Sequence, residues 1–328
     1  MLKAAGRTVA HLDAGAIAST IAWWAPGTRF FSSPERIAIC DMPIPSAGQD
    51  KTTREDYIAY LRAVARHHEL PIRTHERVTN AARFSAAFEL TTESAIDAFA
   101  GNRTVAADNL VLAIGNMHAP RTLGIPGEDS PGVSHYLADP NEYFGKRVLI
   151  VGGKNSAVEA AVRLYRAGAH VTIAYRREDF DSERIKYWLL PELKWLIEKQ
   201  RIGFIPSVEP TRIEPGRVTL ASTRDPSHTQ HIETDMTLLL TGYVQDASLF
   251  EQLGVELVGD ERRPHYDHDT QQTNVPNLYV AGTACGGSQH RARVFIENSH
   301  VHCERIVAAI TGDAVAIPEP AFGAHEES

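Results

Sequence analysis

The sequence of 328 residues predicts about two domains, because a typical domain has roughly 150 residues. Its 33 Lys and Arg against 41 Asp and Glu give a net charge of −8, and no basic stripe is present, so we expect no nucleic-acid partner. Three Cys cannot form a disulfide framework, and no apolar run reaches the roughly 18 residues of a membrane span, so we expect a cytoplasmic protein without a membrane partner.

Apolar and amphipathic patterns predict a chain in which short strands alternate with helices. In chain order, the sequence predicts a strand at 9–12, a helix at 54–68, an antiparallel meander at 84–105, strands at 109–114 and 147–151, a helix at 156–167, a strand at 171–175, a helix at 191–199, a second meander at 208–234, strands at 237–240 and 277–281, and a helix at 295–310. Strands that alternate with helices form βαβ units with a mostly parallel sheet. The predicted fold class is therefore α/β with antiparallel β insertions.

The first predicted strand ends at Asp13, in the position of a carboxylate that binds a nucleotide ribose. In a nucleotide unit the phosphate-binding glycines precede this carboxylate by about 20 residues, so here they would lie before Met1. The sequence thus predicts a nucleotide unit that is N-terminally incomplete, without its first strand and phosphate turn. A downstream start codon and a true deletion are both compatible with this interpretation.

A stronger signal stands in the middle of the chain, where the strand at 147–151 runs into two glycines and a helix begins directly afterwards. Exposed N–H groups at such a helix N-terminus bind a pyrophosphate, so the turn matches a dinucleotide-binding fingerprint. Lys154 stands in the place of the middle glycine of that fingerprint, and an ordinary strand–turn–helix is the alternative interpretation. The predicted cofactor contacts are Gly152, Gly153, Lys154, Asn155 and Ser156.

Two arginines, Arg176 and Arg177, follow the next strand, where an NAD-binding unit carries a carboxylate. That carboxylate would bind the ribose diol and repel a 2′-phosphate, whereas two guanidinium groups bind phosphate by charge and by bidentate geometry. The pair therefore predicts NADPH rather than NADH. A solvated pair beside Glu178 and Asp179 is the alternative.

Three further turns resemble those of flavoprotein reductases. The strand at 109–114 leads into Ala113-Ile114-Gly115, which resembles the Ala/Thr-x-Gly turn through which the chain of these enzymes passes into the second domain. Thr241-Gly242 resembles the corresponding turn through which the chain returns to the first domain. The segment that ends in Ala281-Gly282-Thr283 resembles the last strand of a flavin domain, with Thr283 in place of the usual Asp. The resemblance implies cofactor contacts at Ala113, Gly115, Gly242, Gly282 and Thr283.

Together with residues 28–35, 185–191 and 295–298, these motifs resemble the two-domain NADPH–FAD reductases of the thioredoxin-reductase superfamily, in the bacillithiol-disulfide-reductase-like branch. The resemblance covers essentially the whole chain. It implies two Rossmann-like three-layer nucleotide-binding domains, with FAD bound by residues 1–120 and 246–328 and NADPH bound by residues 121–245. A homodimer is expected from the resemblance alone.

The implied function is a flavin-dependent oxidoreductase of redox homeostasis, which passes hydride from NADPH to FAD and then two electrons to a low-molecular-weight disulfide of the bacillithiol type. An internal dithiol is excluded, because no Cys lies between residues 41 and 284. In the resembled branch the proposed attacking thiol lies in the first glycine-rich turn, so the catalytic residue stays unknown here. Cys285 is either a redox thiol activated at a helix N-terminus or, as we favour, a small core residue.

Two other functions stay open. Residues 126–146 partly resemble the lead-in of flavin monooxygenases, which makes such an enzyme one alternative. An NADPH-binding protein without FAD turnover is the other, because the phosphate turn for FAD is missing. We expect no metal site, since the sequence contains no paired Cys motif and no His-Glu-x-x-His motif, and His300 and His302 point to different faces of a helix.

Overall fold

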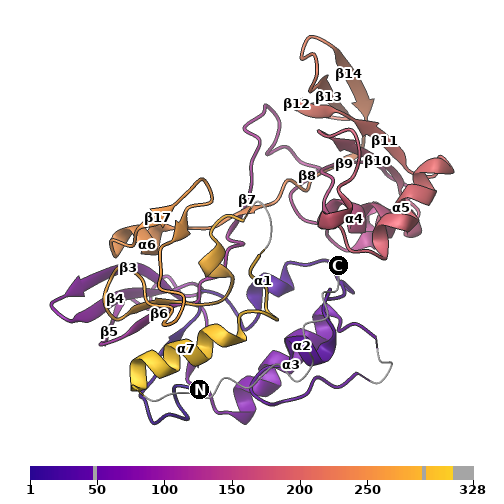
Figure 1. The fold of residues 1–328 in the computed structure, drawn as a ribbon. Coiled ribbons are helices and arrows are strands. Elements are labelled where there is room, and N and C mark those ends of the chain that lie inside the picture. The colour runs from indigo at the N-terminus through magenta and orange to yellow at the C-terminus, as the bar shows by residue number, and fades with distance from the viewer. Residues whose placement is uncertain (47–49, 290–292, 313–328) are drawn as a thin grey trace. The chain divides into compact units, whose positions relative to one another are not determined.

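The computed structural model describes residues 1–46, 50–289 and 293–312, and the chain divides into two units (Figure 1). Unit 1 consists of Met1–Ala22, Gly27–Ala119 and the described residues from Tyr243 onward, and unit 2 consists of Trp23–Pro26 and Pro120–Gly242. The chain thus changes units at 119/120 and 242/243, where the sequence predicted boundaries at 120/121 and 245/246. The assignment of a cofactor to each unit stays a prediction.

Unit 2 is built around a parallel sheet of five strands. Across the sheet these are β11 (Gly203–Pro206), β10 (His170–Tyr175), β9 (Arg147–Val151), β15 (Met236–Leu239) and β8 (Val133–Ser134). Successive side chains of a strand point to opposite faces, so Val148 and Ile150 of β9 pack on the helical side while Leu149 and Val151 pack on the other. Burial of both faces explains the continuous apolar run of β9.

The two faces of this sheet are covered by different elements. On one face lie α4 (Asn155–Arg166) and α5 (Leu189–Glu198), with the short 3-10 helices η1 (Pro140–Tyr143) and η2 (Ser182–Arg184) in the connecting loops. On the other face lies the antiparallel meander of β12 (Val208–Glu214), β13 (Arg217–Ser222) and β14 (Thr229–Glu233). Unit 2 therefore has the three layers that were predicted for the second nucleotide domain.

Unit 1 combines a second meander with two pairs of parallel strands. The meander is formed by β3 (Glu76–Phe84), β4 (Ala87–Ser94) and β5 (Arg103–Ala107), and the parallel pairs by β1 (His11–Leu12) with β2 (Ile72–Arg73) and by β6 (Leu110–Leu112) with β19 (Leu278–Val280). Within the described residues these two pairs are separate sheets. Phe88, Phe250 and Leu278 are among the buried side chains that form the core of this unit.

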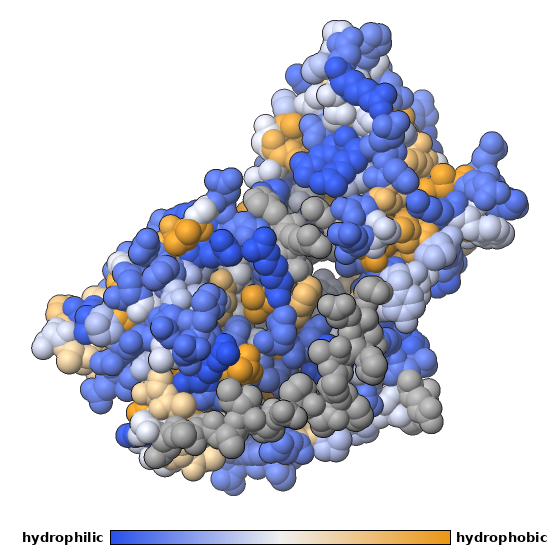
Figure 2. All heavy atoms as spheres, viewed as in Figure 1, coloured by the Kyte–Doolittle hydropathy of each residue, from blue (hydrophilic) through white to orange (hydrophobic). Residues whose placement is uncertain are grey.

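The helices and the remaining short strands complete the fold. Unit 1 contains α1 (Ser19–Ala22), α2 (Pro34–Ile37), α3 (Arg54–His67), α6 (Ser248–Gln252), η3 (Gly282–Gly286) and α7 (His300–Thr311). Its β17 (Leu257–Val258) pairs with β18 (Arg263–Pro264), and β7 (Ala119–Pro120) pairs with β16 (Tyr243–Val244) where the chain passes between units. Figure 2 shows hydrophilic residues over most of the face in view, with smaller apolar patches between them. In the described ranges, we find no helix with the length and apolar character required to cross a bilayer.

One predicted helix begins later than expected. The sequence predicted a helix from residue 295, whereas α7 begins at His300. The side chain of Asn298 explains the delay, because its Oδ1 accepts a hydrogen bond from Phe295 N at 2.8 Å and its Nδ2 donates to Arg293 O at 2.8 Å. Such local side-chain bonds to the backbone compete with helical hydrogen bonds.

Candidate functional site

The turn between β9 and α4 requires glycine at Gly152. This residue has φ +143°, and a Cβ there would lie 2.6 Å from the carbonyl oxygen of Leu240 and 3.2 Å from the Cβ of Ala157. Ala157, itself 1% exposed, is the small residue that lets the helix approach the strand. The turn is therefore a point of close packing between β9, β15 and α4, as the sequence motif implied.

The second glycine of this turn has a role that the sequence did not predict. A Cβ on Gly153 would lie 2.5 Å from ring carbons of Tyr175, so the missing side chain makes room for that ring. Tyr175 is the last residue of β10 and is buried. Its ring covers one side of the turn and holds the backbone in place.

Helix α4 begins with its backbone donors directed out of the turn. Lys154 precedes the helix without a capping hydrogen bond from its side chain among the described residues. The first N–H groups of a helix have no partner within the helix, and the helix dipole adds positive potential there, which together favour an anion. The N-terminus of α4, with Lys154, Asn155 and Ser156, thus has the chemistry of a pyrophosphate site.

The side chain of Asn155 is used for structure. Its Oδ1 accepts a hydrogen bond from Lys186 N at 2.6 Å, and Lys186 Nζ in turn lies 2.8 Å from Glu159 Oε2 on α4. Both partners of this ion pair are largely buried, with side chains 12% and 17% exposed. These bonds fix the loop after η2 beside the start of α4. A direct contact between the Asn155 amide and a cofactor is therefore not needed to explain this residue.

Arg176 and Arg177 follow β10 and are exposed. Because β9 and β10 are parallel neighbours, the arginines lie at the same edge of the sheet as the glycine-rich turn. Arg177 Nη1 is 3.5 Å from Asp181 Oδ2, so part of its charge is balanced, while Glu178 pairs with Arg224 at 2.8 Å. The arrangement keeps positive charge beside a turn that can bind a dinucleotide.

In unit 1 the structure brings two predicted flavin turns together. Strands β6 and β19 are parallel partners, and Ala281 N donates to Leu112 O at 3.2 Å, so the turns that follow them meet at one edge. A Cβ on Gly115, which has φ +74°, would lie 3.8 Å from Thr283 Oγ1. Ala113, Gly115, Gly282 and Thr283 therefore form one cluster.

Gln245 joins these two turns, and the sequence analysis missed it. Its Nε2 donates to Gly115 O at 2.8 Å and to Ala284 O at 3.0 Å. Two carbonyl acceptors identify this atom as the nitrogen, so the other amide atom is the oxygen Oε1. Oε1 is buried and has no hydrogen-bond partner among the residues that the structure describes. An orphaned acceptor between the two turns fits a bound ligand that carries an N–H donor, as a flavin ring does.

Gly242 belongs to unit 2, and Asp13 to another sheet of unit 1 than this cluster. Gly242 has φ +101°, and its carbonyl accepts a hydrogen bond from Arg121 N at 2.9 Å, so it shapes the passage of the chain out of unit 2. Asp13 follows β1, which belongs to a different sheet from β6 and β19, and its Oδ1 accepts a hydrogen bond from Gly15 N at 2.8 Å. The structure therefore places Asp13 at the end of a parallel strand, as expected, with one carboxylate oxygen bonded to its own loop.

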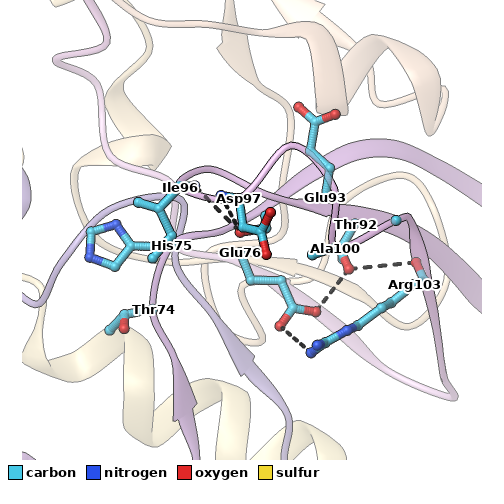
Figure 3. Close-up of a pocket in the computed structure, with 11 residues that line it drawn as sticks. Thr74, His75, Glu76, Thr92, Glu93, Ile96, Asp97, Ala100 and Arg103 are labelled. Atoms are coloured by element: carbon cyan, nitrogen blue, oxygen red, sulfur yellow. Dashed lines mark hydrogen bonds and ion pairs between the residues drawn. The ribbon is translucent and has the colours of Figure 1, made fainter.

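A cavity of about 260 Å³ is lined by residues that follow β2 and by parts of the β3–β5 meander (Figure 3). Its wall includes His75 and Glu76, whose backbone N–H groups donate to Gly15 O and Asp13 O. The carboxylate of Glu76 is 8% exposed and accepts a hydrogen bond from Thr92 Oγ1 at 2.8 Å. The cavity thus adjoins the loop after β1 through the backbone of His75 and Glu76, and Asp13 itself is not among the residues that line it.

Cys285 has the properties of a core residue. It is 3% exposed, and its Sγ lies 3.6 Å from Gln271 Oε1. Burial raises the pKa of this thiol to about 12, so it is protonated at neutral pH and a poor nucleophile. In the part of the chain that the structure describes, no group of three or more His, Cys, Asp or Glu side chains is arranged to hold a metal ion.

The comparison with known proteins identifies the family. A family model described as pyridine nucleotide-disulphide oxidoreductase matches residues 1–282. The chain belongs to this family. It is 30% identical over 311 residues to the bacilliredoxin reductase Bdr of Bacillus subtilis (strain 168), which covers 94% of this chain and 92% of the relative.

Solved structures agree with this assignment. The bacillithiol disulfide reductase Bdr from Bacillus cereus has a TM-score of 0.89 and 29% identity, over 95% of this chain and 93% of the other. Thioredoxin reductase from T. acidophilum shares the fold, with a TM-score of 0.70 and 20% identity over 95% and 92% of the two chains. The resemblance inferred from sequence and the α/β fold class are confirmed, whereas the N-terminal incompleteness of the first nucleotide unit stays a prediction. FAD with a pyridine nucleotide are the cofactors of the family.

Proposed function

We propose that this protein is an NADPH-dependent flavoenzyme that reduces a low-molecular-weight disulfide of the bacillithiol class. The observation that carries the proposal is the turn at the start of α4 with two arginines at the same sheet edge, in a chain of the pyridine nucleotide-disulphide oxidoreductase family. The chain has the helix N-terminus that a dinucleotide pyrophosphate needs, and it has cations where a 2′-phosphate would lie.

In this proposal unit 2 binds NADPH. The backbone N–H groups at the start of α4 bind the pyrophosphate, with Gly152 and Gly153 permitting the tight packing of the turn. Arg176 and Arg177 bind the 2′-phosphate through charge-assisted hydrogen bonds. The buried pair of Lys186 with Glu159 keeps the adjoining loop in place.

Unit 1 binds FAD in the same proposal. The turns with Ala113, Gly115, Gly282 and Thr283 contact the flavin end, and Gln245 Oε1 accepts a hydrogen bond from it. Asp13 binds the ribose of the adenosine end, because its carboxylate follows a parallel strand. When bound, FAD accepts hydride from the nicotinamide and delivers two electrons to a disulfide. The task of the protein is to position both cofactors and exclude water.

The disulfide class follows from the relatives. Two relatives that cover more than nine-tenths of this chain at 29–30% identity are named bacilliredoxin reductase and bacillithiol disulfide reductase. The sequence has no Cys-x-x-Cys motif, and Cys285 is buried with a raised pKa. We therefore propose a substrate that brings its own disulfide to the flavin, so that one NADPH and one proton yield NADP⁺ and two thiols.

The test combines a visible spectrum with turnover. The purified protein should be yellow with bound FAD, and it should oxidise NADPH faster when bacillithiol disulfide is added than when glutathione disulfide or cystine is added, with two thiols formed for each NADPH. A colourless protein that still binds NADPH would instead support an NADPH-binding protein without flavin turnover. NADPH oxidation without thiol formation, together with a long-lived peroxyflavin absorbance, would support a monooxygenase.

A further inference from the structure

The turn that follows β19 is tied to helix α7 by a buried histidine. His302 lies in the first turn of α7 and is 8% exposed, and its Nδ1 accepts a hydrogen bond of 3.1 Å from the backbone N–H of Gly282. A backbone N–H only donates, so Nδ1 carries no proton and the ring is neutral with its proton on Nε2. The bond therefore reports the charge state of His302, and it ends on a glycine that we propose contacts the flavin.

The surroundings of His302 favour the neutral ring. Burial lowers its pKa from the ordinary value, and the charges of Arg305 on α7 and of His268 in the loop before β19 lower it further. Each of these effects opposes an imidazolium at this place. The neutral form is thus the state in which the hydrogen bond to Gly282 exists.

The thiol beside this imidazole and the groups that contact that thiol are also neutral. The thiol of Cys285, in η3, lies 3.7 Å from His302 Nδ1 and 3.6 Å from the amide oxygen Oε1 of Gln271. Burial raises the pKa of Cys285 to about 12, and burial together with Cys285 raises the pKa of Tyr266 to about 12. Neither group supplies the negative charge that would stabilise a protonated histidine.

We propose that His302 is a positioning residue that holds the Gly282–Gly286 turn in its flavin-binding conformation only while its imidazole is neutral. The proposal rests on the proposed binding of FAD at this turn. Protonation places an N–H on Nδ1 opposite the N–H of Gly282, so two donors face each other and the bond is lost. The turn is then released from α7, and FAD binds more weakly in acid.

The sign of the pH effect follows from the direction of the pKa shift. A histidine whose pKa is lowered in the folded protein binds fewer protons than in the unfolded chain. Its stabilising contribution is complete above the unfolded pKa of about 6.5 and falls as the pH drops through the folded pKa. We expect the dissociation constant of FAD to be constant above about pH 7 and to rise by up to about 10-fold per pH unit below the pKa of His302.

Two substitutions separate the hydrogen bond from the titration. His302→Asn keeps an acceptor, because Oδ1 of Asn is as many bonds from Cα as Nδ1 of His, but it cannot be protonated in this range. His302→Leu removes the acceptor. The surrounding residues, His268 among them, are identical in the wild type and both variants.

The experiment measures FAD binding and backbone protection separately. FAD dissociation constants are measured by flavin fluorescence from about pH 5 to 8, the range in which histidine titrates. Hydrogen exchange of the peptide 278–286 is measured by mass spectrometry without flavin. In the wild type we expect FAD binding to weaken and protection from hydrogen exchange to fall in acid. In His302→Asn both should be independent of pH. In His302→Leu we expect weak FAD binding and fast exchange at every pH.

Two results would overturn the proposal. One is an acid dependence in His302→Asn equal to that of the wild type, a comparison that stands even where His302→Leu does not fold. The other is a folded His302→Leu protein whose hydrogen-exchange rate at this turn and whose FAD affinity equal those of the wild type. If the wild type binds no FAD, the proposed function fails. The positioning role is still supported if hydrogen exchange at this turn is slow where His302 is neutral and fast where it is protonated.

Discussion

Replacement of the two arginines after β10 tests the proposed nucleotide specificity. Charge-assisted hydrogen bonds contribute roughly 1.5–3 kcal/mol each to the free energy of binding. Because the side chains of both arginines are exposed, we expect the lower end of this range. Arg177 shares its charge with Asp181 at 3.5 Å, so it contributes less to a phosphate than Arg176 does. We expect Arg176→Ala to raise the KM for NADPH about 10-fold, Arg177→Ala about 3-fold, and the double variant about 30-fold, at about 1.4 kcal/mol per factor of ten.

The assay is the ratio of kcat/KM for NADPH and NADH, measured for each variant at low and at high salt. The KM for NADH should stay at its wild-type value, because NADH has no 2′-phosphate. The difference in KM for NADPH between the variants and the wild type should shrink as salt screens the exposed charges. Arg217→Ala is the matched control, since Arg217 is also an exposed arginine of unit 2 and pairs with Glu214 at 2.7 Å. A double variant that keeps the wild-type preference between the two coenzymes would refute the argument.

Two further substitutions and one labelling experiment test the packing of the fold. Glu128→Ala should lower the free energy of unfolding in urea by about 3 kcal/mol, because this buried carboxylate accepts hydrogen bonds from two backbone N–H groups of its loop, and an unchanged midpoint would contradict this. Gly152→Ala should lower the free energy of unfolding by about 3 kcal/mol and abolish NADPH binding. Gly145→Ala is the control, because a Cβ there meets open space at φ +68°. It should lower the free energy of unfolding by about 1 kcal/mol and leave NADPH binding intact. Iodoacetamide at neutral pH should alkylate the exposed Cys40 while Cys285 stays unmodified by mass spectrometry, and equal labelling of both in the folded protein would show that burial does not protect Cys285.

Much of unit 2 was predictable because its signals are local. The run of apolar residues in β9, the glycines after it and the helix that follows all depend on residues within one short segment, and they predicted β9 and α4 closely. Both meanders were found for the same reason, since alternation and turn residues are read within a few positions. For the first meander the predicted range of 84–105 was too short, because β3 (Glu76–Phe84) lies almost wholly before it and β5 ends at Ala107.

The sequence by itself thus determined the fold class, the family and the place of the glycine-rich turn between β9 and α4. The tertiary structure decided which side chains complete the sites. Gln245 bonds to a residue 130 positions away, Asn155 to one 31 positions away, and His302 to one 20 positions away. Local propensity contains no information about such pairs, because each bond forms only when packing of the whole unit brings the two segments together and removes water from between them.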